Sequence, residues 1–160
     1  MADATSAGDY EPGTQFVYPD LKDGSAITKG NLCDRNGSSG FRTAPVSGAT
    51  GPFVVCVKSA LAGDTTVSVN DTGIVYLVAE GTINPGSLVV PASSTAGRVK
   101  AYTATTIAAT PAQSDVQNAR DEHKLIVGRY MGKVLENDGA TVPSAATTAD
   151  IIRVRFYGGF

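Results

Sequence analysis

The stretch that decides the fold is AGDTTVSVNDTGIVYLVAEGTINPGSLVVPASSTAGRVKAY, residues 62–102. It contains apolar runs at 67–69, 74–79 and 88–90 and a weaker run at 98–102. Val and Ile are stiff at χ1 and fit a pleated surface, so each run predicts a strand. Because turn residues separate the runs, the stretch predicts a β-meander without a helix.

The turns in this stretch have the composition that chain reversal requires. Asn84, Pro85 and Gly86 match a type II turn, which favours Pro at its second position and Gly at its third. The segments 70–73 and 93–97 combine glycine with short polar residues, which also favour turns. The chain is therefore expected to reverse between successive strands.

Further strands are predicted on both sides of this stretch. The apolar run 53–58 predicts a strand, and an Asn-Gly pair within residues 26–43 predicts a hairpin. Residues 125–135 predict a strand whose glycines mark a bulge or a close backbone approach. Residues 113–124 have a helix-compatible composition and are expected to form either one or two helical turns or a solvated loop.

The last predicted strand, residues 151–157, alternates between two kinds of side chain. Ile152, Val154 and Phe156 share one face. Arg153, Arg155 and Tyr157 share the other face. This pattern is typical of a half-buried strand with one side turned to water or to a partner.

These elements predict the fold class and the domain organisation. Roughly eight to ten short strands favour an all-β fold, a small antiparallel β-barrel or sandwich with at most one short helix. The charged fraction of 18% also favours strands and turns over helices. We expect one β-barrel domain at residues 26–160, preceded by an extended, flexible N-terminal arm at residues 1–25, where Pro and Gly are dense.

The predicted arm carries the aromatic residues Tyr10, Phe16 and Tyr18. Two interpretations remain open for them. The rings can fold back on the body and cover a sheet edge, or they can dock on a partner.

Charge and hydropathy bear on the classes of partner. The net charge is −2 and no basic block is present, which disfavours binding to nucleic acid. No apolar run approaches the ~20 residues of a membrane-spanning helix. The N-terminus lacks the basic and apolar regions of a signal peptide, so we expect synthesis and folding in a cytoplasm, with no membrane partner.

Cysteine and histidine usage indicates neither a metal site nor a cofactor. Cys56 lies within an alternating apolar run, which favours a buried small hydrophobe. A bridge between Cys33 and Cys56 is possible, but spacing alone does not decide it. The one histidine, His123, stands in a charged run, where exposure is the expected state. We therefore expect no metal and no cofactor.

Catalytic motifs are also missing from the sequence. Asp64 and Asp71 flank a predicted strand, and a carboxylate pair can do acid–base chemistry. Aspartate at such positions is, however, what turns ordinarily use. We expect a protein that is not an enzyme and keep a small hydrolase using Asp64 or Asp71 as the alternative.

The pattern of glycine turns and apolar alternation resembles that of the capsid cement, or head decoration, proteins of tailed phages. The segments that carry the resemblance are 62–64, 67–69, 73, 75–79, 81–89, 97–99, 127–130 and 153–156. It extends over about residues 26–157, although residues 103–124 and 137–148 are longer than is usual in that family.

The resemblance implies a viral structural protein that binds the outer surface of an icosahedral capsid and stabilises it. Its partners would be the major capsid protein and itself, often as a homotrimer, and it would reside in the bacteriophage virion. Another structural virion protein, such as a tail, fiber or baseplate module, is the alternative. We expect the capsid-binding arm to use Tyr10, Phe16 and Tyr18, and an inter-subunit or capsid-facing side to use Arg153, Arg155 and Tyr157.

Overall fold

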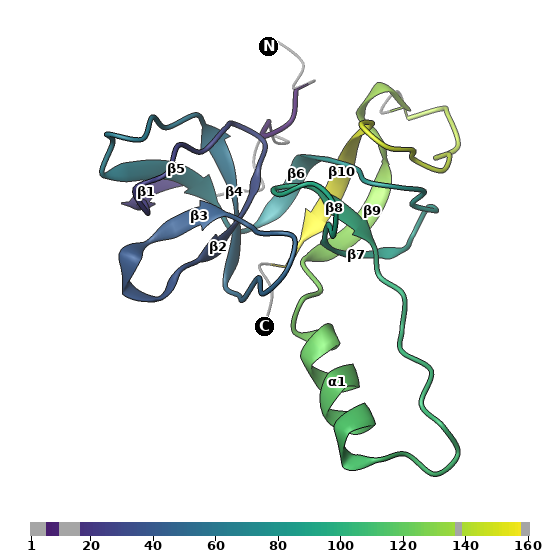
Figure 1. Cartoon of the computed structure of the whole chain (residues 1–160). Coiled ribbons are helices and arrows are strands. Elements are labelled where there is room, and N and C mark those ends of the chain that lie inside the picture. The colour runs from purple at the N-terminus through teal and green to yellow at the C-terminus, as the bar shows by residue number, and fades with distance from the viewer. Residues whose placement is uncertain (1–5, 10–16, 137–138, 158–160) are drawn as a thin grey trace.

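The computed structural model describes residues 6–9, 17–136 and 139–157, which form two five-stranded antiparallel sheets and one α-helix (Figure 1). The first sheet contains β1 (Val17–Leu21), β2 (Leu32–Arg35), β3 (Phe41–Thr43), β4 (Phe53–Lys58) and β5 (Thr66–Asn70). The second sheet contains β6 (Gly73–Val78), β7 (Leu88–Pro91), β8 (Val99–Ala101), β9 (Gly128–Lys133) and β10 (Ile151–Phe156). The helix α1 (Gln113–His123) and the 3₁₀ turns η1 (Gly37–Ser39) and η2 (Val134–Glu136) complete the described elements.

The strand order is β1-β5-β4-β2-β3 in the first sheet and β6-β10-β9-β7-β8 in the second. The predicted mostly-β, sandwich-like class is confirmed. The strand predicted at 53–58 is β4, and the hairpin predicted within 26–43 is the β2–β3 pair around η1.

The stretch 62–102 forms the strands that its apolar runs predict, but the meander prediction was wrong. β5 lies between β1 and β4 in the first sheet, whereas β6 pairs with β10 in the second. The segment 70–73 therefore carries the chain from one sheet to the other. A local turn signal marks a change of direction, but the pairing partner depends on distant strands that the local pattern does not contain.

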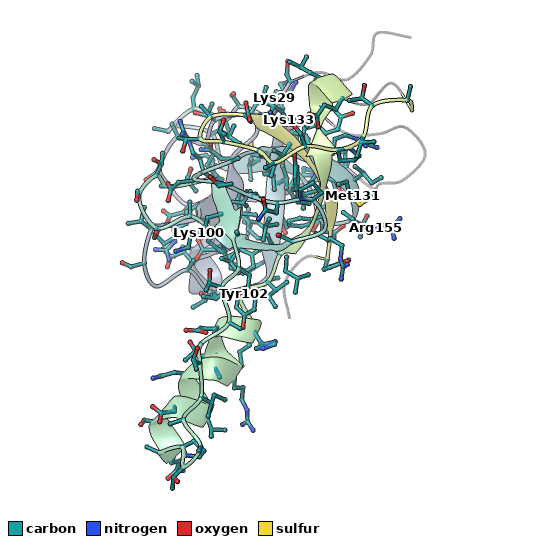
Figure 2. The ribbon with its side chains drawn as sticks, turned by 90° about the vertical axis from the view of Figure 1, so that its right-hand side faces the viewer. Lys29, Lys100, Tyr102, Met131, Lys133 and Arg155 are labelled. Carbon is teal, nitrogen blue, oxygen red and sulfur yellow. The ribbon has the colours of Figure 1, made fainter. Side chains whose placement is uncertain are left out.

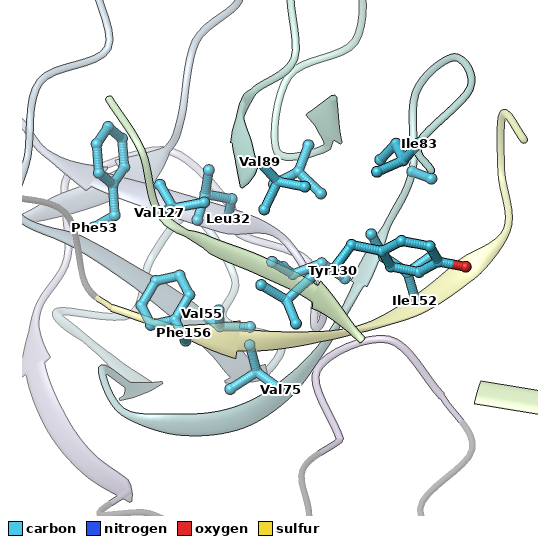
Figure 3. Close-up of a cluster of buried hydrophobic side chains, with 14 of the residues drawn as sticks. Leu32, Phe53, Val55, Val75, Ile83, Val89, Val127, Tyr130, Ile152 and Phe156 are labelled. Atoms are coloured by element: carbon cyan, nitrogen blue, oxygen red, sulfur yellow. The ribbon is translucent and has the colours of Figure 1, made fainter. Parts of the chain in front are cut away.

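The main hydrophobic core lies between the two sheets (Figure 3). The first sheet contributes Phe53 and Val55 of β4, which pack with Val75 and Ile152 of the second sheet. A second cluster covers the other face of β4 and includes Val54 and Cys56, together with Cys33, Val67 and Val69. β4 is thus buried on both faces, which explains its continuous apolar run.

Each sheet curls until its outer strands approach one another. A bridge between Lys22 and Phe41 joins the end of β1 to β3 in the first sheet. A bridge between Ala79 and Val99 joins the end of β6 to β8 in the second. Each closure consists of one bridge at a strand end, so β1 itself still pairs with β5 alone.

Residues 17–21 differ from the expectation of a flexible arm, because they form β1 and pair with β5. Pro19 fits there because β1 pairs on one side alone, and an edge strand tolerates a residue without an N–H. The buried ammonium of Lys22 then donates to the carbonyl oxygens of Asp23 at 2.9 Å, Ser25 at 2.9 Å and Ala62 at 3.3 Å.

The short described segment before β1 also contacts the body. The Gly8 N–H donates to the carbonyl of Tyr76 in β6 at 2.7 Å, and the Tyr76 N–H donates to the carbonyl of Asp9 at 3.0 Å. Asp9 forms an ion pair with Lys29. This segment therefore connects β6 of the second sheet to the loop that precedes β2.

The helix α1 is 11 residues long, which exceeds the one or two turns expected, and none of its residues is buried. Together with the preceding segment 103–112 it projects away from the sheets (Figure 1). The Asp115 carboxylate caps its start by accepting from the Ala112 N–H at 3.0 Å. Among the described residues, no helix has both the length and the apolar character needed to cross a membrane.

Glycines confirm the predicted irregularities in β9 and in the β6–β7 turn. A side chain at Gly128 would lie 2.4 Å from the carbonyl oxygen of Arg155, so β9 and β10 approach closely there. Gly132 has a φ of 124° beside the register shift between β9 and β10. Gly86 has a φ of 81°, and Ser87 N–H donates to the Asn84 carbonyl, as the type II turn requires.

Candidate interaction surface

The alternation predicted for residues 151–157 is confirmed. Ile152, Val154 and Phe156 are buried in the core between the sheets. On the opposite face Arg155 and Tyr157 are exposed and Arg153 is half-buried. The arginines predicted to lie on a partner-facing side thus belong to the outer face of the second sheet.

Strand register adds Arg129 to this face, a residue that the sequence analysis missed. Arg155 of β10 lies directly opposite Ile74 of β6 on one side and Arg129 of β9 on the other. Arg129 in turn lies opposite Leu88 of β7. We call the set Ile74, Arg155, Arg129 and Leu88 the arginine row. The local alternation, with Gly128 and Tyr130 buried on either side, indicates that Arg129 faces outward, but its place opposite Arg155 depends on long-range pairing.

The arginine row places two like charges next to one another. Cβ atoms of directly opposed residues lie about 4.5–5.5 Å apart, and like charges at this separation are unfavourable. Within the part of the chain that the structure describes, neither Arg129 nor Arg155 forms an ion pair. Other basic residues do form such pairs, for example Arg42 with Asp34 at 2.9 Å and Lys133 with Asp150 at 3.4 Å.

Further side chains border the arginine row. In Figure 2, Lys133, Met131 and Arg155 follow one another down toward the right of the view, and Lys100 and Tyr102 lie farther left, above the helix. The Lys133 ammonium forms an ion pair with Asp150 Oδ2. The same oxygen also accepts from the Thr147 N–H at 2.8 Å. Arg129 and Arg155, by contrast, are directly opposed and exposed and have no ion pair among the described residues.

The predicted arm anchors lie elsewhere. Tyr10 and Phe16 are outside the described residues. Tyr18 lies in β1 of the first sheet, half-buried against the cluster that contains Cys56. Its hydroxyl donates to Asp71 Oδ2 at 3.3 Å, and burial followed by the Asp71 charge raises its pKa. The ring of Tyr18 therefore lies against the body of the protein, as in the first of the two interpretations given above for the aromatic residues of the arm.

A cavity of about 940 Å³ lies where residues 103–124, the segment 103–112 with α1, which we call the α1 hairpin, leave the second sheet. Its wall includes the loop 45–51, Val90 and Ala101, and its rim includes Asp121 and Glu122 of α1. The Glu122 carboxylate accepts from the Thr105 hydroxyl at 2.6 Å, which connects the helix to the segment 103–112 before it. The His123 ring contacts Tyr102 edge-on, with centroids 5.5 Å apart.

The candidate catalytic carboxylates are not brought together. Asp64 precedes β5 and Asp71 follows it, so the two lie beyond opposite ends of the strand, about 20 Å apart at the rise of an extended strand. Asp64 Oδ2 accepts from the Leu61 N–H at 2.7 Å, and Asp71 accepts from Tyr18. Both therefore serve as turn or strand-end acceptors. In the residues described, no His, Cys, Asp and Glu side chains gather into a group of three that would hold a metal ion.

Both cysteines are buried and free. Cys56 is fully buried, as predicted, and burial raises its pKa. Burial raises the pKa of Cys33 further, and the neighbouring Cys56 and Asp34 add to the increase. Neither thiol is therefore activated as a nucleophile.

Among solved structures, this fold is similar to the crystal structure of the head fiber gp8.5 N base of bacteriophage phi29. The TM-score is 0.50 at 10% sequence identity, and the similarity covers 90% of this chain and 97% of that chain. At this level of identity the comparison shows a shared fold. No protein family and no curated protein matches the sequence.

Proposed function

We propose that this chain is a non-enzymatic structural protein of a phage head that binds the outer surface of the icosahedral capsid as a decoration, or cement, protein. The observation that carries the proposal is the similarity in fold, over nearly the whole of both chains, to the head fiber base of bacteriophage phi29. The sequence motifs support it separately, because they resemble those of capsid cement proteins.

The proposed role is mechanical. The protein bridges neighbouring subunits of the major capsid protein through its N-terminal residues, including Tyr10 and Phe16, and through the outer face of the second sheet, including Arg153, Arg155 and Tyr157. It acts as a homotrimer, so that several weak contacts are made at once. Ordering an extended segment costs roughly 1–2 kcal/mol per residue, and multivalent attachment offsets this cost.

A binding assay with empty, expanded capsids of the phage that encodes this chain tests the proposal. We expect labelled protein to sediment with capsids in a saturable manner and to raise the temperature at which capsids disrupt. A protein that neither sediments with capsids nor changes their stability would contradict the proposed function.

Point variants, rather than a truncation, are needed to measure how much the N-terminal arm contributes to binding capsids. Removing residues 1–25 would also remove β1 and Lys22, which belong to the folded body. We therefore expect Tyr10→Ala and Phe16→Ala to weaken binding to capsids without loss of the fold. Leu61→Ala is the control, because Leu61 is 74% exposed in a turn outside both proposed surfaces. Unchanged affinity in both aromatic variants would remove the arm from the mechanism.

The comparison also favours a second candidate, the base of a head fiber. A cement protein occupies the shell at many equivalent points, whereas a fiber base anchors an elongated appendage. Labelled protein imaged on particles, together with its copy number per particle, separates the two. The mass of the protein in solution tests the homotrimer.

A further inference from the structure

We infer that the arginine row is a docking site for carboxylates on a protein partner, and that within the proposed function this partner is an acidic patch on the outer surface of the capsid shell. The inference rests on the proposed function for the identity of the partner. The chemistry of the site rests on the described residues alone.

The first argument is the arrangement of charge. Arg155 and Arg129 lie directly opposite one another on β10 and β9, both are exposed, and neither has a carboxylate partner among the residues that the structure describes. A protein with a net charge of −2 and 15 acidic residues has many carboxylates with which to neutralise such a pair. Leaving the two guanidinium groups adjacent and unpaired keeps them available to an external anion.

The second argument is the geometry of the guanidinium group. Arginine presents a rigid, planar set of donors that matches a carboxylate in bidentate fashion. β10 pairs with β6 and β9, and β9 pairs with β10 and β7. The sheet therefore fixes the backbone positions from which both arginine side chains extend. Two adjacent arginines on a rigid sheet suit neighbouring carboxylates, as on an acidic protein patch.

The neighbours of the arginines favour protein over nucleic acid. Ile74 and Leu88, half-buried aliphatic residues, occupy the two ends of the row. A polyphosphate backbone is usually followed by a longer track of Lys and Arg. Two aliphatic ends around a pair of arginines, with the charge of the nearby Lys133 already paired to Asp150, instead match the mixed composition of protein interfaces, where arginine is enriched.

The experiment measures binding of Arg129→Gln, Arg155→Gln and the double variant to expanded capsids. Arg120→Gln is the matched control, because it removes the same charge from an exposed position on α1. We expect each single variant to bind about tenfold more weakly and the double variant more weakly still, with Arg120→Gln unchanged. When the salt concentration is raised from about 0.05 M to about 0.3 M, the affinity of the wild type for capsids should fall more steeply than that of the double variant.

Two further measurements keep the result interpretable. The free protein of each variant should retain its far-UV circular dichroism and its resistance to denaturant, because both arginines are exposed and their like charges repel. Capsids whose surface carboxylates have been converted to amides should bind the wild type as weakly as untreated capsids bind the double variant.

The outcomes separate this inference from the proposed function. Wild-type protein that does not bind capsids would overturn the proposed function. Wild-type and double-variant proteins that bind untreated capsids equally would overturn the inference while the function stands. Tighter binding of the wild type to duplex DNA than to capsids would assign the row to phosphates and would also overturn the inference.

Discussion

Gly128 is the residue at which β9 has no room for a side chain. A Cβ atom there would lie 2.4 Å from the carbonyl oxygen of Arg155 and 2.6 Å from the Val154 side chain. We expect Gly128→Ala to lower the free energy of unfolding by about 2 kcal/mol or more, because backbone atoms of β10 would have to shift. Urea denaturation measures the effect.

Gly63 is the matched control for this substitution. A Cβ atom at Gly63 meets no atom within 4 Å. Gly63→Ala should therefore change the free energy of unfolding by less than about 1 kcal/mol in either direction. Equal effects of the two substitutions would contradict the close approach of β9 and β10.

The buried cysteines lead to a second prediction. Because burial raises the pKa of both Cys33 and Cys56, the thiols stay protonated and shielded in the native protein. We expect a chromogenic disulfide reagent at pH 8 to react slowly with the native protein and to titrate both thiols at once after denaturation. Rapid labelling of either thiol in the native state would contradict the buried positions.

At the scale of elements, the loop before β8 is held by one carboxylate. Glu80 accepts from the N–H groups of Ser93, Ser94 and Thr95 at 3.1, 3.0 and 2.7 Å. Burial alone would raise the pKa of Glu80, but the N–H donors outweigh it and lower the pKa overall. A group with a lowered folded-state pKa stabilises the protein above its unfolded pKa of about 4.3, and the contribution is lost as pH falls through the folded value.

Glu80→Gln tests this linkage. We expect the variant to be less stable than the wild type at pH 7, and the difference to shrink as pH falls below the unfolded pKa and the wild-type carboxyl becomes protonated in the native state. Denaturation curves at a series of pH values measure the difference. A constant difference at every pH would mean that the charge of Glu80 does not hold the loop.

The α1 hairpin contains no buried residue, so we expect the body to fold without it. None of the residues of α1 is buried, and Tyr102 contacts His123 where the hairpin begins and ends. We expect replacement of residues 104–122 by a short Gly-Ser linker to change the free energy of unfolding by about 1 kcal/mol or less. The helical circular dichroism signal should disappear, while β-sheet signals remain. An unfolded product would show that the hairpin contributes to the core.

The positions of the strands follow closely from the sequence, whereas the strands with which each of them pairs do not. β4 and β10 match the predicted segments because apolar content and alternation are local properties. The placement of β5 and β6 in different sheets depends on pairing over long sequence distances, which no local pattern encodes. For the same reason the sequence did not predict Arg129 as the neighbour of Arg155. The strand β1 was not predicted because Pro19 argues against a regular strand, although an edge strand tolerates proline.

At the scale of the whole molecule, the two sheets share one hydrophobic core. Phe53 lies in the first sheet, is 0% exposed, and packs in the cluster that contains Val75, Val154 and Phe156 of the second sheet. Such sharing means that neither sheet can lose its structure without exposing apolar surface of the other. The body should therefore unfold in one cooperative transition.

Phe53→Ala is the variant that tests this coupling. We expect it to lower the free energy of unfolding by about 3–5 kcal/mol, because it leaves a cavity between the sheets. Val46→Ala, at a side chain that is 43% exposed, should have an effect below about 1 kcal/mol. Hydrogen exchange should show β4 of the first sheet and β10 of the second losing protection together in Phe53→Ala. If β4 became labile while β10 kept wild-type protection, the sheets would be separate folding units, and the shared core would not hold the molecule together.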